Sequence, residues 1–179
     1  MKVLIDANVL FPTVQREMVL GVAGQGLLAP FWSARLLEEW ARAAAKIDAA
    51  AEAQARGEIA ILRANWPKAE IAPQPGLEAR LWLPDPADVH VLAVAIAGSA
   101  DVILTQNAKD FPRHILAEEG VSRADPDGFL WGLWQAQPDA LEHVAGQVLA
   151  EAQRLSGKDW DMRSLFKKAR LPRLAKALS

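Results

Sequence analysis

Apolar and polar positions along the first 130 residues follow a pattern typical of buried strands separated by helices. Val3-Leu4-Ile5 is a continuous apolar run, too short for a helix, that ends at Asp6. Such a run is typical of a central strand of a parallel sheet, which is covered on both faces. A second run of this kind spans 101–105, and a shorter apolar segment spans 27–32. We therefore predict at least two buried strands, and the sequence alone does not establish whether they are neighbours.

Helical periodicity lies between these runs. It predicts helices over 15–23, over 34–56 with Ser33 as its N-cap, and over 86–97 with Asp85 as its N-cap. The third of these helices is apolar nearly all round, which indicates that it is buried. Strands that alternate with helices imply right-handed parallel crossovers and a layered α/β fold.

The last third of the chain is predominantly helical in pattern. It predicts helices over 129–137 and 140–155, and two short segments on either side of Pro172. We predict a domain over 1–130 and a helical C-terminal extension over 131–179 that packs on or beside it.

Acidic residues follow the predicted strands, at the edge of a parallel sheet where ligands bind. Asp6 comes directly after the first strand, Asp110 lies in the loop after the second, and Asp88 lies in the first turn of the buried helix. Each has a structural alternative: Asp6 could form a turn with Asn8, Asp85 and Asp88 could stabilise a helix start, and Asp110 could begin a short helix.

A fourth acid would come from the helix over 34–56, where Glu38 and Glu39 both fall outside the apolar stripe. Periodicity does not choose between them. If Asp6, Asp88, Asp110 and one of these glutamates converge in the fold, their carboxylates would raise one another's pKa unless a cation were present. Mg²⁺ or Mn²⁺ prefers oxygen ligands and also accepts phosphate oxygens, so the pattern predicts metal-dependent hydrolysis of a nucleic acid.

Composition narrows the classes of protein that remain. The 179-residue chain has no cysteine, which excludes disulfides, thiolate metal sites and a cysteine nucleophile. Its three histidines are too far apart for a zinc-binding helix of the H-E-x-x-H type. No apolar run reaches the roughly 18 residues of a membrane span, and Asp6 interrupts any signal peptide. We expect a cytoplasmic protein that does not enter a membrane.

Charge and aromatic residues add two further hypotheses. The net charge of −2 divides into +6 over 154–179 and −8 over the rest, so the basic end could bind a polyanion or form a solvated helix surface. The seven tryptophans could stack on bases, although we expect most of them, such as Trp40, in the core. We expect His90, the one polar residue of the buried helix, to be a core histidine with its hydrogen bonds satisfied.

Three segments together resemble the PIN-domain family, and most closely its VapC-type branch of toxins from prokaryotic toxin–antitoxin pairs. They are 3–10 (VLIDANVL), 33–40 (SARLLEEW), and 85–88 (DPAD) continuing to 105–111 (TQNAKDF). The resemblance covers roughly residues 1–130. It implies a three-layer α/β/α sandwich around a central parallel sheet, with an acidic cluster that binds Mg²⁺ or Mn²⁺ and cleaves RNA.

The resemblance also assigns candidate catalytic residues. The first family acid falls on Asp6 and the third on Asp88. The helix acid usually precedes an aliphatic residue in the family. It falls on Glu39, which precedes the apolar Trp40, rather than on Glu38. Asp6 and Asp88 would hold the metal.

The chain departs from the family at the T-x-D position, which holds Asn107, with Asp110 three residues later as the nearest carboxylate. The departure puts a second metal in doubt. Glu39 and Asp110 would complete the site, Asn107 would position water or a phosphate, and Lys109 and the basic end would contact RNA phosphates.

The first hypothesis is therefore a metal-dependent endoribonuclease, a toxin with an antitoxin protein as partner and a helical end that could form a homodimer. The alternative is a non-catalytic PIN-like module that binds RNA or protein, which the departure at Asn107 supports. A phosphatase of the haloacid-dehalogenase type ranks last, because Asn8 stands where that chemistry needs a second aspartate.

Overall fold

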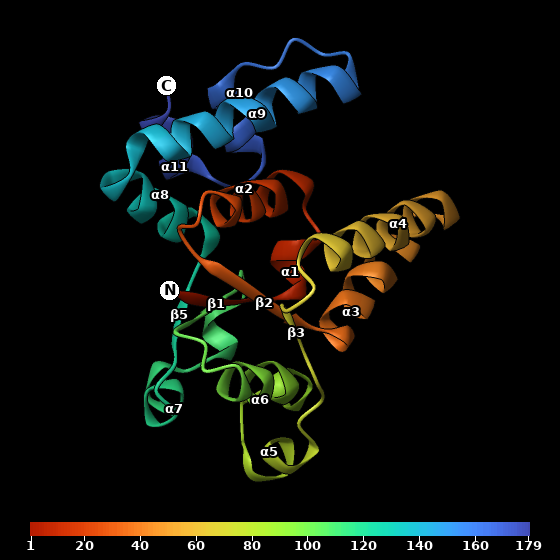
Figure 1. The fold of residues 1–179 in the computed structure, drawn as a ribbon, viewed down its shortest axis with the longest axis vertical. Helices are drawn as coiled ribbons and strands as arrows, with labels where there is room; N and C mark the ends of the chain where they lie inside the picture. Colours follow the sequence, from red (N-terminus) through yellow and green to blue (C-terminus); the bar gives the residue numbers. More distant parts are fainter. The chain divides into compact units, whose positions relative to one another are not determined.

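A computed structural model describes all residues from 1 to 179. Its centre is a five-stranded sheet with the strand order β3-β2-β1-β4-β5, in which every pair of neighbours is parallel (Figure 1). The strands are β1 (Lys2–Ile5), β2 (Ala29–Ser33), β3 (Glu70–Ile71), β4 (Val102–Leu104) and β5 (Ser122–Ala124). With helices flanking this sheet, the predicted α/β/α fold class is confirmed.

Eleven α-helices and two short 3₁₀ turns accompany the strands. The helices are α1 (Ala7–Leu10), α2 (Thr13–Gly24), α3 (Ala34–Ala45), α4 (Ala49–Asn65), α5 (Pro75–Arg80), α6 (Val89–Ala97), α7 (Arg113–Glu118), α8 (Pro126–Ala136), α9 (Pro138–Ser156), α10 (Met162–Lys168) and α11 (Pro172–Ala177). The 3₁₀ turns are η1 (Pro86–Asp88) and η2 (Ala108–Asp110). None of the helices is both long enough and apolar enough to span a membrane.

The pairing of β1 with β4 fixes the position of the predicted acids. Leu4 lies beside Ile103 and Ile5 beside Leu104, and all four side chains are fully buried. The next residue on each strand, Asp6 on one and Thr105 on the other, therefore emerges at the same edge of the sheet.

The single helix predicted over 34–56 is wrong. The chain forms α3 and α4 instead, with a break at 46–48. Asp48 has extended backbone angles, and its carboxylate accepts a hydrogen bond of 2.7 Å from the N–H of Ala51. A short acidic side chain offers the backbone this local partner, so it favours a new N-cap over helix continuation even inside an alanine-rich run.

The chain divides into two compact units. The first consists of Met1–Phe11 and Ala29–Ala124 and contains the whole sheet. The second consists of Pro12–Leu28 and Asp125–Ser179 and is entirely helical. This division falls at residue 124 and assigns α2 to the helical unit, whereas the sequence predicted a boundary at 130. That boundary, and the packing of 131–179 on the domain, stay predictions.

Within the helical unit, α2 packs on α9 and α8 packs on α11. A Cβ at Gly21 of α2 would collide with the side chain of Val144 in α9, so glycine permits this close approach. Asp127 of α8 is buried, and its carboxylate accepts hydrogen bonds of 3.0–3.1 Å from the N–H groups of Arg173 and Leu174 at the start of α11. This buried acid therefore has a structural partner, a helix N-terminus.

Candidate active site

Asp6 lies where β1 ends and α1 begins, with only 6% of its surface exposed. Its carboxylate accepts hydrogen bonds from the N–H of Ala7 at 2.7 Å, from the hydroxyl of Thr105 at 2.8 Å and from the side-chain amide of Asn8 at 3.2 Å. Burial raises the pKa of Asp6, and the bonds from Thr105 and Ala7 oppose that rise. The negative charge of Glu39 raises it further.

The loops that follow β1 and β4 are tied together by polar side chains. The Asn8 side-chain oxygen accepts a hydrogen bond from the N–H of Gln106 at 3.1 Å, and the Gln106 side chain donates to the Asn8 carbonyl at 3.0 Å. The Thr105 hydroxyl accepts from the Asn8 amide at 3.2 Å and from the N–H of Asn107 at 3.1 Å. Asp6 is thus held in a preorganised frame of neutral donors.

Asp88 lies at the end of η1, half-buried, directly before α6. Burial is the largest cause of a pKa raised to about 6, and His90 opposes the rise. Neighbouring negative charges add to the rise, and they belong, in decreasing order of effect, to Asp6, Asp85 and Asp110. The structure therefore brings Asp6, Asp88 and Asp110 close enough for their charges to interact, as the sheet-edge argument expected.

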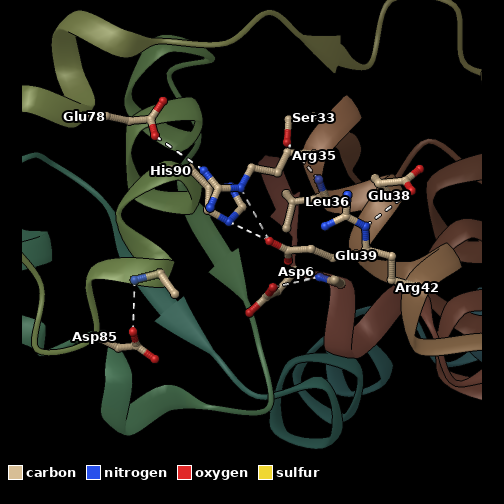
Figure 2. A network of polar contacts seen from close by, with 12 residues as sticks. Asp6, Ser33, Arg35, Leu36, Glu38, Glu39, Arg42, Glu78, Asp85 and His90 are labelled. Carbon is tan, nitrogen blue, oxygen red and sulfur yellow. Dashed lines mark hydrogen bonds and ion pairs between the residues drawn. The ribbon is translucent and has the colours of Figure 1, made fainter. Parts of the chain in front are cut away.

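Glu38 and Glu39 are adjacent in sequence but have different surroundings (Figure 2). Glu38 accepts two hydrogen bonds from the guanidinium of Arg56 in α4, at 2.9 and 3.1 Å, and lies 3.5 Å from Arg42. The Arg56 hydrogen bond is the main reason that the pKa of Glu38 is lowered. Glu38 is therefore already neutralised by arginines.

Glu39 points toward the buried His90, whose Nε2 lies 2.8 Å from its Oε1, and toward Arg35 at 3.8 Å (Figure 2). Its charge reaches Asp6, because it contributes to the raised pKa of that carboxyl group. Of the two glutamates that periodicity left open, Glu39 is thus the one that lies near the other acids. Its catalytic role stays a prediction.

Asn107 and Asp110 follow β4 in the next loop. Asn107 is exposed, and its side chain does not cap η2. Asp110 is half-buried at the end of η2, and its charge contributes to the raised pKa of Asp88. Asp110, rather than Asn107, is therefore the residue of this loop that adds negative charge to the cluster.

Two residues of this network were not predicted as part of the site. Thr105 is fully buried and supplies the hydroxyl that holds Asp6. His90 was expected to be a satisfied core histidine, and it is buried, but Nε2 contacts Glu39 and Nδ1 has no partner. Their positions in the sequence could have indicated both residues, because Thr105 directly follows a buried strand and His90 comes two residues after Asp88.

The carboxylate oxygens of this acidic cluster are candidate ligands for a divalent cation. No three His, Cys, Asp or Glu side chains are grouped so as to hold one ion by themselves. Mg²⁺ does not require such a group, because it keeps several waters and commonly uses one or two carboxylates together with substrate phosphates. Acids whose pKa values are raised by burial and mutual repulsion, with oxygen as the ligand atom, fit Mg²⁺ or Mn²⁺.

Comparison with known proteins gives a family. The family model described as PIN domain matches residues 2–109, more than half of the chain. The matched range includes Asp6, Glu39 and Asp88 and ends one residue before Asp110. Searches of curated proteins and of solved structures gave no match. PIN domains are in general metal-dependent nucleases. The chain belongs to the PIN-domain family.

Proposed function

We propose that this protein is a metal-dependent endoribonuclease that hydrolyses phosphodiester bonds in RNA. The observation that carries the proposal is the convergence of Asp6, Asp88 and Asp110 at one edge of the sheet with no arginine or lysine paired to any of them. Carboxylates that repel one another without an internal counter-charge favour a bound cation. RNA as the substrate rests on the resemblance to VapC-type toxins.

Asp6 and Asp88 would hold Mg²⁺ or Mn²⁺. Such an ion supplies charge neutralisation, an activated water and stabilisation of the charge that develops on the phosphate. The protein contributes rigid positioning: neutral donors from Thr105 and Ala7 hold Asp6, and η1 fixes the backbone of Asp88. Glu39 and Asp110 would orient water or an additional ion, and the exposed Asn107 would position water or a phosphate.

We further propose the role of a toxin that an antitoxin protein neutralises, acting in the cytoplasm. The sequence resemblance to VapC-type toxins supports this role. A homodimer formed through the helical unit belongs to the same proposal.

The test is an RNA-cleavage assay that compares the unmutated protein with Asp6→Asn, each with Mg²⁺, Mn²⁺ or chelator. We expect cleavage by the unmutated protein only, and only with metal, with a loss of about 100-fold or more in the variant. The matched control is Asp101→Asn. Asp101 is exposed, precedes β4 at the opposite end of that strand, and accepts a hydrogen bond from the N–H of Lys2 that an amide oxygen can also accept. Equal activity in Asp6→Asn would contradict the mechanism.

The second candidate function is a PIN-like module that binds RNA or a protein without cutting. It is favoured by Asn107 in place of a carboxylate and by the lack of three acids grouped around one point. Stoichiometric RNA binding, without metal-stimulated cleavage of any of a broad set of RNAs, would establish it over the nuclease.

A further inference from the structure

Trp82 is the only one of the seven tryptophans that is exposed. Trp32 and Trp40 are buried, and the remaining four are half-buried. Its exposed fraction is 67%, the highest among the large apolar residues. Indole is a large, amphipathic aromatic group that is usually at least partly buried. The solvent-exposed indole of Trp82, close to the proposed active site, is therefore available to a ligand.

The backbone around Trp82 holds its ring outward. Leu83 is 1% exposed, and Leu81 is half-buried with an extended backbone at φ −84° and ψ 155°. Successive side chains of an extended segment point to opposite sides, so Trp82 points away from the core that Leu83 enters. Pro84 restricts the backbone of Leu83 to extended conformations. The ring is therefore presented on a segment anchored on its inner side, which lowers the entropy lost on binding.

Chain length places Trp82 close to the acids. It precedes Asp85 by three residues, so their Cα atoms are at most roughly 10 Å apart. The N–H of Asp88 bonds to the carbonyl of Asp85 at 3.1 Å, a turn that keeps those Cα atoms within about 7 Å. Trp82 thus lies at most roughly 17 Å from Asp88 between Cα atoms, a span of a few nucleotides of a stacked strand.

We propose that Trp82 stacks on an unpaired base of the RNA strand whose backbone binds at Asp6 and Asp88. The inference rests on the proposed function. Every base has a neutral aromatic face, so Trp82 can stack on any of them. Stacking does not depend on a positively charged side chain, and it can therefore operate near a cluster of acids. Duplex RNA hides those faces inside its stack, so Trp82 discriminates against it.

Other occupants fit Trp82 less well. A stable protein interface buries a contiguous surface of many residues, and a membrane contact needs an extended apolar face. The exposed residues that follow Trp82 along the chain are Pro84, Asp85, Pro86 and Ala87, with no second large apolar side chain among them. A single ring beside an acid is the size of one base.

The experiment measures binding of fluorescein-labelled single-stranded RNA and of its duplex by anisotropy, in chelator and with Ca²⁺, a hard cation that takes oxygen ligands, in place of Mg²⁺. Trp82→Ala is compared with Trp82→Phe, which keeps a ring, and with Ile61→Ala as the matched control. Ile61 is 61% exposed on α4 of the same unit. All variants are first checked for an unchanged Tm.

We expect Trp82→Ala to weaken binding of the single strand by about 5- to 100-fold, with Trp82→Phe and Ile61→Ala within about threefold of the parent and duplex binding unchanged. Unchanged single-strand binding in Trp82→Ala overturns the inference. So do an equal loss for the duplex, and an absence of single-strand binding by the parent protein under both conditions.

Binding and cleavage separate this inference from the proposed function. A loss of binding in Trp82→Ala, with no cleavage by the unmutated protein in Mg²⁺ or Mn²⁺, would leave the stacking site standing and remove the nuclease. If the unmutated protein cleaves RNA, Trp82→Ala should raise KM by a similar factor with kcat within about twofold. An unchanged KM would remove the stacking site and leave the nuclease.

Discussion

Carboxylates in two regions of the sheet-containing unit are balanced in different ways. On the outer surface some glutamates are paired with arginines: Glu38 pairs with Arg56 and Arg42, and Glu119 accepts two hydrogen bonds from Arg80, the shorter at 2.7 Å. These bonds are the largest cause of the lowered pKa values of Glu38 and Glu119. Negative charge in this region is neutralised within the protein.

At the ends of β1 and β4 the arrangement is the reverse. Asp6 accepts hydrogen bonds from the Thr105 hydroxyl and from the N–H of Ala7. No arginine or lysine is paired to Asp6 or to Asp88, and the pKa values of both are raised rather than lowered. The charges of Asp6 and Asp88 are therefore not balanced by arginines, as those of Glu38 and Glu119 are, and the two carboxylates repel one another. The difference supports the proposal that an external cation binds at this edge.

The contrast between the two regions is tested most directly by replacing Glu39 and Glu38 separately with glutamine. We expect Glu39→Gln to lower kcat for RNA cleavage by about 30-fold or more, because its charge is near Asp6. Its amide oxygen can still accept from His90, so the fold should be retained.

Glu38→Gln is the matched control for Glu39→Gln. It weakens a surface contact to Arg56 and should change cleavage by less than about twofold. The two variants are measured at the same saturating concentrations of metal and RNA. A larger loss in Glu38→Gln than in Glu39→Gln would reverse the assignment.

A smaller effect is expected from Thr105→Val, which removes the hydroxyl that donates to Asp6 and keeps the side-chain shape. Without that bond the pKa of Asp6 rises further, so less of the carboxylate is ionised at low pH. We expect a loss of about tenfold in cleavage near pH 6 that becomes smaller near pH 8.

The exposed Thr13 provides the control for Thr105→Val, because Thr13→Val should leave the rate against pH unchanged. A loss in Thr105→Val that is the same at every pH would mean that the hydroxyl does not act through the ionisation of Asp6.

The positions of some of these acids could be predicted from the sequence and those of others could not, for physical reasons. Asp6 and Asp110 could be predicted because apolar runs mark parallel strands, whose carboxyl ends share one edge. The approach of Glu39 rather than Glu38 could not be derived from periodicity, since both lie outside the apolar stripe. It depends on Arg56 from another helix and on His90 from α6, both far away in sequence. Here the family resemblance supplied what the pattern could not.

Two other features escaped the sequence because local and tertiary effects compete. Asp48 ended a helix that alanine propensity favoured, since a single side-chain cap outweighs small propensity differences. Trp82 could not be told from the six other tryptophans, because it lies in the proline-rich segment before η1, where no periodicity marks an inner face. The exposure of Trp82 depends on tertiary packing, which the sequence pattern does not reveal.

The smallest expected effect is on stability against pH without metal, and it follows from Asp88. Its pKa is raised from 3.8 to about 6, so the folded state binds more protons than the unfolded state between these values. Its contribution is therefore fully present below about pH 4, is lost as pH rises through 6, and amounts to about 1–2 kcal/mol after screening by solvent.

Urea unfolding in chelator at pH 4.5 and at pH 7.5 measures this loss, and Asp88→Asn should remove most of it. Asp6, Asp85 and Asp110 also face Asp88, and Asp6, whose pKa is raised too, keeps a residual slope of the same sign. His90 also faces Asp88 and opposes the rise in the pKa of Asp88. Mg²⁺ at pH 7.5 should restore stability in the unmutated protein and far less in Asp88→Asn, because a bound cation replaces the proton as counter-charge. Equal stabilisation of both proteins by Mg²⁺ would mean that the unbalanced acids do not attract the ion, and the contrast between the two regions would lose its functional meaning.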